Sequence, residues 1–561
     1  MTDPCHPANV TGGAFILEAP TWVFSPEQFD ADANLMVQAA HQFTRREVAP
    51  VLEQLDAFKE GLMESLFRKA CDLGLGGIEA PVRFGGLGLK KSLGTRIVEA
   101  YSLNGSFATT LGVHCGIAQS PITLFGTDEQ CERYLPRLTS GAWMGAYALS
   151  EAGSGSDALS LSCRADRTAD GSFRLSGTKM WVSNARWAGL FIVFARTDKG
   201  VTAFLVEREY QGVSVGPEEH KMGLKGSSTA RLVLDDVEVP ASNVLYFDGE
   251  GHRVALNALN LGRFKLAAMA LGPARDALHH SAKYALERKQ FGSPIARFGL
   301  VREKVARCTA LFFAAESMLY RTAGIVDHAF SKVDDGAEER VEQSRIAAEE
   351  CAVEASIGKV FATEMLAACA DEAVQIHGGY GFTEEFPVAR IYRDARVTRI
   401  YEGTNEINRI FVINRLVRRG HLAKALDCEP TCDVHCHFIS AAKAAWEKYG
   451  GIPPLPLGDG RGDGGPSQQL AARLADLAMH LYAVQAVRMR AQQMAEHPQS
   501  EFARACAATY EGIARAAAAT AAADVFARCG SEERACIEVS YPETAEVVAD
   551  AVLEAQGYPI L

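Results

Sequence analysis

The chain has 561 residues, of which 48% are hydrophobic and 22% are charged, and this composition excludes a disordered chain and a coiled-coil rod. Because the net charge is −12, we expect no nucleic-acid binding driven by overall charge. No run of about 18 uncharged apolar residues occurs, so no membrane-spanning helix is expected.

The start of the chain and its cysteines indicate a cellular compartment. The first residues, MTDPCHPANVTGG, contain neither a basic segment followed by an apolar run nor an Arg-rich amphipathic stretch. We therefore expect no secretory signal or transit peptide and predict a cytoplasmic protein of bacterial type. The 14 cysteines are scattered, which is typical of reduced core thiols and not of a disulfide framework.

Helical spacing opens the chain, and residues 1–142 are predicted to form a helical N-terminal domain. Leu62, Leu66 and Ala70 recur on one helix face. The segment FGGLG at residues 84–88 is expected to be a tight turn, because three glycines in five residues oppose a helix.

Residues 143–248 change to short apolar or alternating segments, which are typical of strands. The runs at 191–194 and 203–206 are apolar, and glycine-containing turns at 169–171 and 198–200 separate such segments. This pattern predicts a middle β domain of about 100 residues.

Helices return over residues 249–423. One face of a long helix is marked by apolar residues that step by 3, 4, 4 and 3 positions: Leu271, Ala274, Leu278, Ala282 and Ala285. Residues 424–466 contain two Gly- and Pro-rich runs and are predicted to be a linker. Residues 467–561 are Ala-rich with apolar residues at helical spacing, which predicts an extra C-terminal helical domain.

Two segments of the middle domain carry residue types that suit a planar, polar ligand. The loop at 147–157 contains two glycines and four hydroxyl side chains, which bring backbone N–H groups close to a ligand. In the segment 177–184, Trp181 can cover a planar ring while Ser183 donates a hydrogen bond. Taken alone, the loop also fits a solvated turn, and Trp181 also fits a core residue.

Two further segments change this interpretation. One is RKQFG at 288–292, at the end of the long helix; the other is QIHGG at 375–379, followed by YEGTNEI at 401–407. In this order and spacing, the four segments resemble the acyl-CoA dehydrogenase family over roughly residues 30–420. The tail after Gly420, together with NLGRF at 260–264, is similar to the very-long-chain branch of that family.

The resemblance implies an α+β multidomain fold. It consists of a helical N-terminal domain, a central β-barrel-like domain, a C-terminal four-helix bundle and the extra C-terminal helical domain. The implied cofactor is FAD. The implied reaction is α,β-dehydrogenation of fatty acyl-CoA thioesters to trans-2-enoyl-CoA, the first step of β-oxidation, with hydride passing to FAD.

The same resemblance assigns roles to individual residues. Glu402 matches the catalytic base that removes the α-proton. Contacts to FAD are assigned to Tyr147, Leu149, Ser150, Gly155, Ser156, Trp181, Val182, Ser183, Arg288, Phe291, Gln375, Gly378, Gly379, Thr404 and Glu406. Contacts to the acyl-CoA substrate are assigned to Ser156, Asn260, Arg263 and Gly403. Arg288 and Phe291 match contacts to the FAD of a neighbouring subunit, which implies an oligomer.

The chemistry of the reaction explains why such groups are needed. A thioester α-proton is weakly acidic, so fixed donors must polarise the carbonyl; the Glu402 backbone N–H and an FAD hydroxyl are expected to do so. Desolvation of the Glu402 carboxylate is expected to raise its basicity toward the operating pH. Some relatives carry the base on the long helix, but the corresponding place near Gly262 offers no carboxylate.

A cluster in the predicted linker offers a different chemistry. Five soft ligands fall within ten residues: Cys428, Cys432, His435, Cys436 and His437. Their number would suffice for zinc, but the spacing lacks a second paired module. We predict no bound metal and interpret these residues as part of a poorly ordered linker.

Partners follow from the tail and the resemblance. We expect a homodimer, an electron-transfer flavoprotein as electron acceptor and a preference for long acyl chains, with the pocket floor near residues 109–121. Membrane contact is expected to be peripheral at most. An arginine repeat at 390–399 is expected to be ion-paired or to face a subunit, and not to bind nucleic acid. Two alternatives are an acyl-CoA oxidase that uses oxygen, and a scaffold or assembly role carried by the tail.

Overall fold

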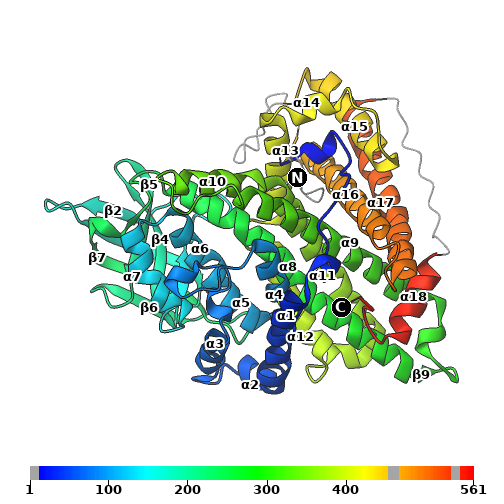
Figure 1. Ribbon diagram of the computed structural model, residues 1–561, viewed down its shortest axis with the longest axis horizontal. Coiled ribbons are helices and arrows are strands. Elements are labelled where there is room, and N and C mark those ends of the chain that lie inside the picture. Colours follow the sequence, from blue (N-terminus) through cyan, green and yellow to red (C-terminus); the bar gives the residue numbers. More distant parts are fainter. Residues whose placement is uncertain (1–11, 453–466, 532–543, 561) are drawn as a thin grey trace. The chain divides into compact units, whose positions relative to one another are not determined.

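The computed structural model describes residues 12–452, 467–531 and 544–560 (Figure 1). The chain divides into two compact units. The sheet unit comprises Phe29–Lys265 and Ala329–Glu349. The helical unit comprises the described parts of Met1–Gln28, Leu266–His328 and Glu350–Leu561. Helix α8 (Gly251–Glu287) contributes residues to both units. The two units are defined by contacts and therefore do not test the domain boundaries predicted from the sequence.

The sheet unit begins with helices whose first turns are capped by local side chains. Asp30 accepts a hydrogen bond from the Ala33 N–H at 2.8 Å, Asn104 accepts one from the Phe107 N–H at 2.9 Å, and Thr127 forms a capping box. The helices are α1 (Ala31–Phe43), α2 (Leu52–Asp56), α3 (Leu62–Asp72), α4 (Lys91–Tyr101), α5 (Gly105–Gly112), α6 (Ser120–Phe125), α7 (Asp128–Thr139) and α10 (Arg340–Glu350). The helical N-terminal region and the turn at 84–88, where Gly85 has φ +82°, are confirmed.

The middle β domain is confirmed as a single sheet. Its strands are β1 (Met144–Ala148), β2 (Arg164–Arg167), β3 (Phe173–Ser183), β4 (Ala188–Thr197), β5 (Gly200–Glu207), β6 (Val213–Glu218), β7 (Thr229–Val239) and β8 (Val244–Leu245). They follow the order β6-β7-β3-β2-β4-β5-β8, and β1 also pairs with β4. Among the described strands no pairing joins β6 to β8, so the sheet is an open path and the expected barrel-like closure is not found. The two-residue β8 is too short to carry a ladder onward.

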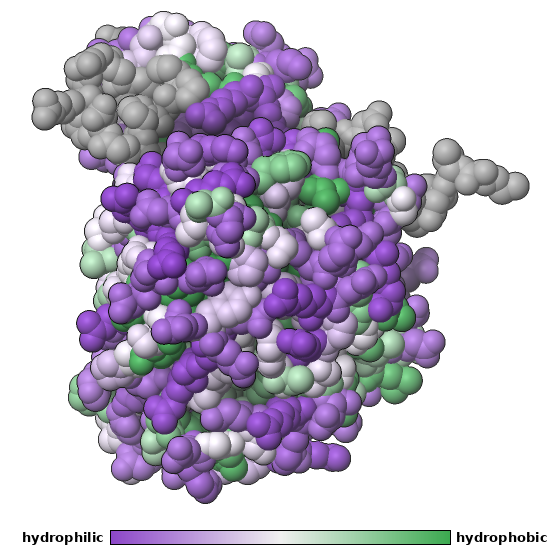
Figure 2. Space-filling view, turned by 90° about the vertical axis from the view of Figure 1, so that its left-hand side faces the viewer, coloured by the Kyte–Doolittle hydropathy of each residue, from purple (hydrophilic) through white to green (hydrophobic). Residues whose placement is uncertain are grey.

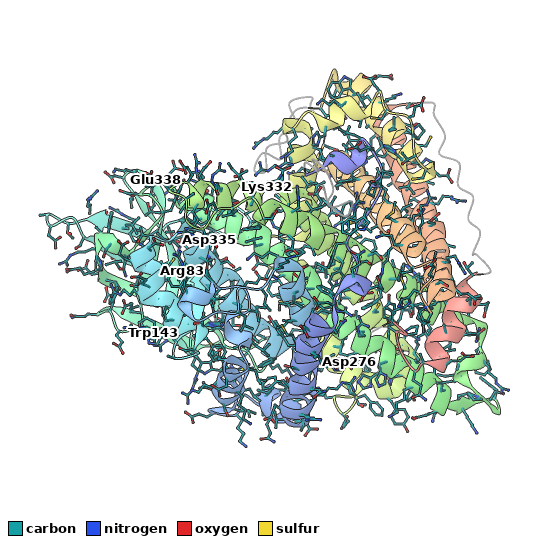
Figure 3. The ribbon with its side chains drawn as sticks, viewed as in Figure 1. Arg83, Trp143, Asp276, Lys332, Asp335 and Glu338 are labelled. Atoms are coloured by element: carbon teal, nitrogen blue, oxygen red, sulfur yellow. The ribbon has the colours of Figure 1, made fainter. Side chains whose placement is uncertain are left out.

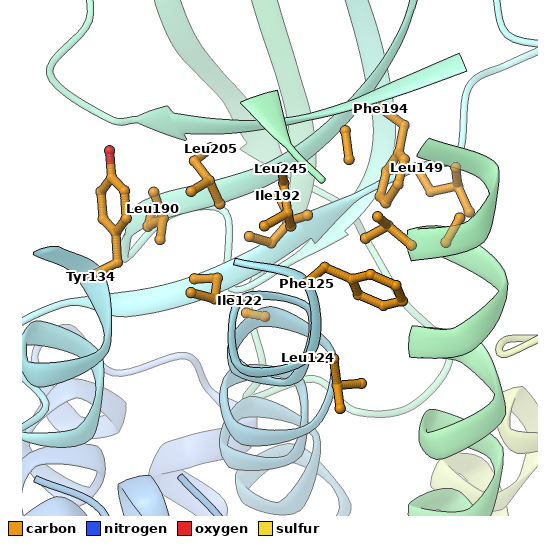
Figure 4. Close-up of a cluster of buried hydrophobic side chains, with 14 of the residues drawn as sticks. Ile122, Leu124, Phe125, Tyr134, Leu149, Leu190, Ile192, Phe194, Leu205 and Leu245 are labelled. Atoms are coloured by element: carbon orange, nitrogen blue, oxygen red, sulfur yellow. The ribbon is translucent and has the colours of Figure 1, made fainter. Parts of the chain in front are cut away.

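The central strand β4 supplies side chains to two hydrophobic clusters. Leu190, Ile192 and Phe194 pack with residues of α6 and α7 (Figure 4). Phe191 and Val193, which alternate with them, belong to a second cluster with side chains of β3, β5 and β7. Because both faces of β4 are covered along its middle, residues 190–195 form a continuous apolar run.

The helical unit contains the predicted C-terminal bundle and the extension. Its elements are part of α8, β9 (Lys289–Gln290), β10 (Ser293–Pro294), α9 (Gly299–Phe330), α11 (Ala352–His377), α12 (Pro387–Ala395), α13 (Asn405–Arg418), α14 (His421–Ala425), α15 (Asp433–Tyr449), α16 (Gln468–Gln493), α17 (Ser500–Cys529) and α18 (Thr544–Glu554). The five residues predicted to line one face of the long helix, from Leu271 to Ala285, are all buried.

The C-terminal extension packs on this bundle. Helix α16 lies against α17 and α13, and α18 lies against α17 (Figure 1). Arg490 of α16 is fully buried and forms ion pairs with Glu27 at 2.6 Å and with Glu316 of α9 at 2.8 Å. Glu316 also accepts a hydrogen bond from the Tyr558 hydroxyl at 3.0 Å. The extension is thus held to the bundle by buried ion pairs and hydrogen bonds within the chain itself.

One helix lies where only a linker was expected. Residues 433–449 form α15, inside the predicted linker 424–466. Val434, Phe438, Ala441 and Ala445 of α15 are buried at helical spacing. The Gly-rich runs that follow α15 dominated the composition of this region, so the helical pattern was not detected from the sequence. The predicted linker, 424–466, therefore wrongly included the helix at 433–449. The second Gly-rich run, at 458–466, lies outside the described residues.

The outer surface is mostly polar where it is visible. The face shown in Figure 2 is largely hydrophilic, with hydrophobic residues in small separate groups. Exposed charged side chains such as Lys332, Asp335 and Glu338 follow α9 in the sheet unit (Figure 3). Across the described helices, none has both the length and the apolar character needed to cross a membrane.

Candidate functional site

The predicted base lies in a turn of the helical unit with unusual backbone geometry. Glu402 has φ +56° and Gly403 has φ +78°, two left-handed residues in succession. Such a conformation is uncommon for a residue with a side chain, and it clusters at functional sites. The next residue, Thr404, caps α13 by accepting a hydrogen bond from the Ile407 N–H at 3.3 Å. Glu406, also predicted to contact FAD, is exposed in the first turn of α13.

A buried lysine supports this turn. The Lys359 ammonium, on α11, donates to the Gly403 carbonyl oxygen at 2.8 Å and to the Asn405 side-chain oxygen at 2.7 Å. Lys359 is fully buried. The Asn408 side chain donates to the same Gly403 carbonyl at 2.8 Å. Side chains from α11 and α13 therefore both fix the peptide that follows Glu402 and Gly403.

The support continues into the C-terminal extension. Asn405 Nδ2 donates to Glu364 Oε1 at 3.0 Å, and two Arg409 nitrogens donate to the Glu364 oxygens at 2.8 and 2.9 Å. Arg409 Nε also donates to Asp476 of α16 at 2.7 Å. Burial by itself raises the pKa of Glu364, but Arg409 and Asn405 outweigh burial and lower that pKa below its usual value. Glu364 is therefore ionised at neutral pH.

In the sheet unit, a second fully buried lysine fixes the loop after β1. Lys179 donates to the Leu149 carbonyl oxygen at 3.2 Å and to Glu151 Oε1 at 2.7 Å. Burial by itself raises the pKa of Glu151, but Lys179 and Ser162 lower it below its usual value. Ser150 lies between the two points of contact, so the backbone of this predicted flavin contact is held in place.

Several residues predicted to contact FAD have side chains that pack against other parts of the protein. Leu149 and Val182 are buried in the two hydrophobic clusters, and the Tyr147 ring centre lies 5.1 Å from that of Phe194. Leu149 and Val182 could therefore contact a ligand only through their backbone. Ser183, next to Val182, is half-buried.

Trp181 is not a core residue, so the alternative that it packs in the core is wrong. It is 55% exposed, has φ +54° and lies where the register of β3 shifts between Lys179 and Val182. The irregular register leaves the ring outside while Val182 packs inside. Gly155 and Ser156 are also exposed, and a Cβ on Gly155 would meet no atom within 4 Å. An exposed indole and an open glycine loop fit a planar ligand with polar edges.

The contacts predicted to reach the FAD of a second subunit lie in the helical unit. Phe291, between β9 and β10, is 96% exposed and has φ +52°. The Arg288 guanidinium carbon lies 5.8 Å from the centre of the Tyr380 ring. Tyr380 directly follows the segment that contains Gln375, Gly378 and Gly379, so the structure brings Arg288 close to that segment. A Cβ on either of these two glycines would meet no atom within 4 Å.

The two substrate contacts predicted on α8 lie together in the sheet unit. Arg263 Nη1 donates to Asn260 Oδ1 at 3.3 Å, and both residues are buried. They are three positions apart, which places them on one face of the helix.

The cysteine and histidine cluster belongs to the start of α15 and the residues before it. His435 is buried, with Nε2 3.0 Å from the Ile16 carbonyl oxygen and Nδ1 accepting from the Thr431 N–H at 3.1 Å. Both ring nitrogens of His435 thus have partners in the protein. Within the described part of the chain, no group of three His, Cys, Asp or Glu side chains could hold a metal ion.

Two residues that hold these loops, Lys179 and Lys359, are missing from the set predicted from the sequence. A signal for Lys359 exists, because its neighbours on α11 include Ile357, Val360 and Phe361. A lysine inside an apolar helical segment has to find oxygen partners when it is buried. Which oxygens it finds depends on segments far away in the chain.

The comparison with protein families covers three successive parts of the chain. Profiles described as acyl-CoA dehydrogenase N-terminal, middle and C-terminal domains match residues 30–142, 146–237 and 249–417, respectively. A probable acyl-CoA dehydrogenase of Bacillus subtilis is 42% identical over 415 residues, which cover 73% of this chain and 70% of that protein.

Two further similarities concern the extension and the branch of the family. A crystal structure of an acyl-CoA dehydrogenase complexed with FAD from Bacillus anthracis matches with a TM-score of 0.91 and 34% identity, covering 98% of this chain and 100% of that one. The human very long-chain specific acyl-CoA dehydrogenase is 39% identical over 365 residues. That match covers 63% of this chain and 53% of the human protein.

Proposed function

Since the chain belongs to the acyl-CoA dehydrogenase family, we propose that it converts fatty acyl-CoA thioesters to trans-2-enoyl-CoA, with Glu402 as the base that takes the α-proton. This is the first step of β-oxidation. The observation that carries the assignment of the base is the left-handed turn at Glu402, whose following peptide is held by Lys359 and Asn408.

The residues present fit FAD, the cofactor of the family. Trp181 and Phe291 are large exposed aromatic side chains on left-handed backbone, and Gly155, Gly378 and Gly379 leave open space beside the chain. Surfaces of this kind suit an isoalloxazine ring and a nucleotide with many polar atoms. Bound FAD supplies the acceptor for the hydride that leaves the β-carbon. We propose that Trp181 and Ser183 contact the flavin, and that Arg288 and Gln375–Gly379 contact the nucleotide part.

The task of the Glu402 turn is to remove a weakly acidic proton. Glu402 as a residue is half-buried and its Oε2 atom is buried, and desolvation makes a carboxylate a stronger base. Its backbone N–H is proposed to polarise the thioester carbonyl, which makes the α-proton more acidic. On the substrate side, Arg263 and Asn260 offer charge and hydrogen-bonding capacity for the CoA part.

We further propose that the substrates have long acyl chains. The predicted pocket floor contains a π-helix, Val113–Gln119, a form that is frequent at functional sites. His114 Nε2 lies 3.1 Å from the Leu138 carbonyl oxygen, and Gln119 donates to the Gly76 carbonyl at 2.6 Å. The side chains that could fill the floor are thus tied to the protein, while a Cβ on Gly116 would meet no atom within 4 Å. Similarity to very long-chain specific enzymes supports the same proposal.

The proposed partners are a second copy of the chain and an electron-transfer flavoprotein. A phenylalanine that is 96% exposed, as Phe291 is, favours a covered surface in an oligomer. The packing of α16 on α13 supports a homodimer in which the extension covers the bundle. Light scattering coupled to size exclusion tests this: a monomer that keeps full FAD and activity would contradict it.

A panel of straight-chain and branched acyl-CoAs, offered to the purified yellow protein with an artificial electron acceptor, tests the proposed function. We expect flavin bleaching and enoyl-CoA formation that are highest with long straight chains. Absence of bleaching with every thioester would contradict the proposal. Peroxide formation at the turnover rate without an added acceptor would instead identify an oxidase.

A further inference from the structure

A continuous series of polar contacts joins the Glu402 turn to the C-terminal extension. Its members, here named the relay, are Lys359, Asn405, Glu364, Arg409 and Asp476. They come from α11, α13 and α16, and all belong to the helical unit. At one end of the relay, Lys359 contacts Gly403, the residue after the predicted base. At the other end, Asp476 lies outside the part of the chain matched by the family profiles, which stops at residue 417.

The first contact of the relay fixes the backbone of the turn. Lys359 donates to the Gly403 carbonyl oxygen, so it fixes the Gly403–Thr404 peptide, which directly follows the two left-handed residues Glu402 and Gly403. A left-handed residue with a side chain persists only where its surroundings hold it. Asn408 shares the Gly403 carbonyl, but its own backbone lies in α13, whereas Lys359 reaches the carbonyl from α11. The lysine therefore ties the turn to a second helix.

The second contact fixes the lysine. Asn405 accepts from Lys359 through Oδ1 and donates to Glu364 through Nδ2, so both ends of the amide are committed. Turning this amide over would place its NH2 group against the ammonium and its oxygen against a carboxylate. Glu364 therefore fixes the orientation of the Asn405 amide, and the Asn405 amide in turn fixes the position of the Lys359 ammonium.

The last contacts bring in the extension. Arg409 makes a two-pronged contact to Glu364 and a further hydrogen bond to Asp476, so one planar guanidinium is shared by two carboxylates. Such forked contacts impose geometry as well as charge. The Arg409 and Asp476 side chains are only 17% and 14% exposed, so solvent screens the pair little. The Arg409 head group is therefore oriented by α16 as well as by α11.

We propose that Lys359 is a positioning residue for the base Glu402, and that Asp476 of the C-terminal extension maintains this arrangement through Arg409, Glu364 and Asn405. The extension thereby acts on proton removal and not only on assembly. This inference rests on the proposed role of Glu402.

The test compares three full-length, FAD-loaded variants with the wild type. Lys359→Met removes the donor to the Gly403 carbonyl, and Asp476→Asn removes the charge at the far end of the relay. Glu511→Gln is the matched control, because Glu511 makes a forked contact to Arg488 of α16 at 2.6 and 2.7 Å but takes no part in the relay. Its pair also joins two helices of the extension.

The primary readout is exchange of the acyl-CoA α-hydrogen with D2O under anaerobic conditions, followed by mass spectrometry. We expect Lys359→Met to slow exchange by about 10²-fold, since misplacement of a reacting group by about 1 Å costs that much. We expect Asp476→Asn to slow it by about 3- to 10-fold. KM and flavin content should stay within about 2-fold of the wild type, and Glu511→Gln should match the wild type, because neither substrate nor cofactor binding is altered.

A second readout does not depend on activity. Amide hydrogen exchange of residues 401–404 should speed up in Lys359→Met and, less strongly, in Asp476→Asn, and should stay unchanged in Glu511→Gln. If Lys359→Met fails to fold, Asp476→Asn decides the question alone. Wild-type α-hydrogen exchange in Asp476→Asn would overturn the role of the extension. This holds even if Asp476→Asn lowers the melting temperature as much as Glu511→Gln does, because a loss of stability alone is not the proposed effect.

Failure of the inference can be told apart from failure of the proposed function. Glu402→Gln is measured in the same exchange assay. If Glu402→Gln exchanges the α-hydrogen at the wild-type rate, the proposed base is wrong. If Glu402→Gln loses exchange while the Lys359 and Asp476 variants keep it, only the relay is refuted.

Discussion

Each unit of the molecule contains a fully buried lysine that holds a loop to which chemistry is assigned. In the sheet unit, Lys179 contacts Leu149 and Glu151, which both belong to the loop that it holds. In the helical unit, Lys359 contacts Gly403 and Asn405, and the contacts continue through Glu364 and Arg409 to another helix. The first support is local, whereas the second extends across α11, α13 and α16.

The difference indicates how the two loops should respond to change. A loop that provides its own carboxylate partner depends on few other residues. A turn whose support passes through three helices depends on how those helices pack. We therefore expect the flavin loop to be insensitive to changes in the extension and the Glu402 turn to be sensitive to them.

The largest effect on stability is expected for Lys179→Met. It leaves the Glu151 carboxylate buried without its ammonium partner, which costs about 3–5 kcal/mol in the free energy of unfolding of the sheet unit. We also expect less bound FAD, because the backbone around Ser150 loses its support. Scanning calorimetry and the flavin-to-protein absorbance ratio measure both effects. Lys199→Met is the control: its pair with Asp248 is exposed at the lysine, so we expect a change below about 1 kcal/mol.

A pH-dependent effect is expected for His114 in the sheet unit. Burial lowers the pKa of His114 to about 4, from the usual 6.5. Between these two values the unfolded state binds a proton that the folded state does not, so stability is lost as the pH falls from about 6.5 to about 4. The loss reaches about 3 kcal/mol at most.

Replacing His114 tests this directly. His114→Gln should be less stable than the wild type at pH 7.5, and the difference should shrink at pH 5, because glutamine does not titrate. Calorimetry at both pH values measures it, and the exposed His220→Gln provides the control. A difference between His114→Gln and the wild type that is the same at both pH values would show that His114 is not held neutral by burial.

The smallest effect tests the independence of the two supports. Lys179→Met and Asp476→Asn lie in different units and share no described contact, so their effects on stability should add within about 0.5 kcal/mol. Lys359→Met and Asp476→Asn belong to one relay and should deviate from additivity by more than about 0.5 kcal/mol. Equal additivity in both double variants would remove the distinction between a local and an extended support.

Periodicity in the sequence predicts elements whose burial follows from local pattern. The apolar face from Leu271 to Ala285 and the apolar run at 191–194 both appear as expected, in α8 and β4. Helix α15 was missed because glycines beside it dominated the composition. The open ends of the sheet were missed because strand pairing is set by segments distant in the chain.

The candidate site shows the same limit. Motif resemblance pointed to Glu402 and Trp181, but no spacing rule predicts that both have left-handed backbone. The exposure of Trp181 depends on a register shift within β3. The carboxylate partner of Lys179 and the amide partner of Lys359 lie 28 and 46 residues away in the chain. Neither contact can therefore be recognised from neighbouring residues in the sequence.

The central claim, that Glu402 is the base, is tested most directly by stopped-flow measurement of flavin reduction in Glu402→Gln. Glutamine keeps the shape and hydrogen bonding of the side chain but cannot accept the proton. We predict that FAD and acyl-CoA still bind while the rate of flavin reduction falls by about 10²–10⁴-fold. The exposed Glu385→Gln should keep the wild-type rate. Near wild-type flavin bleaching in Glu402→Gln would contradict the account.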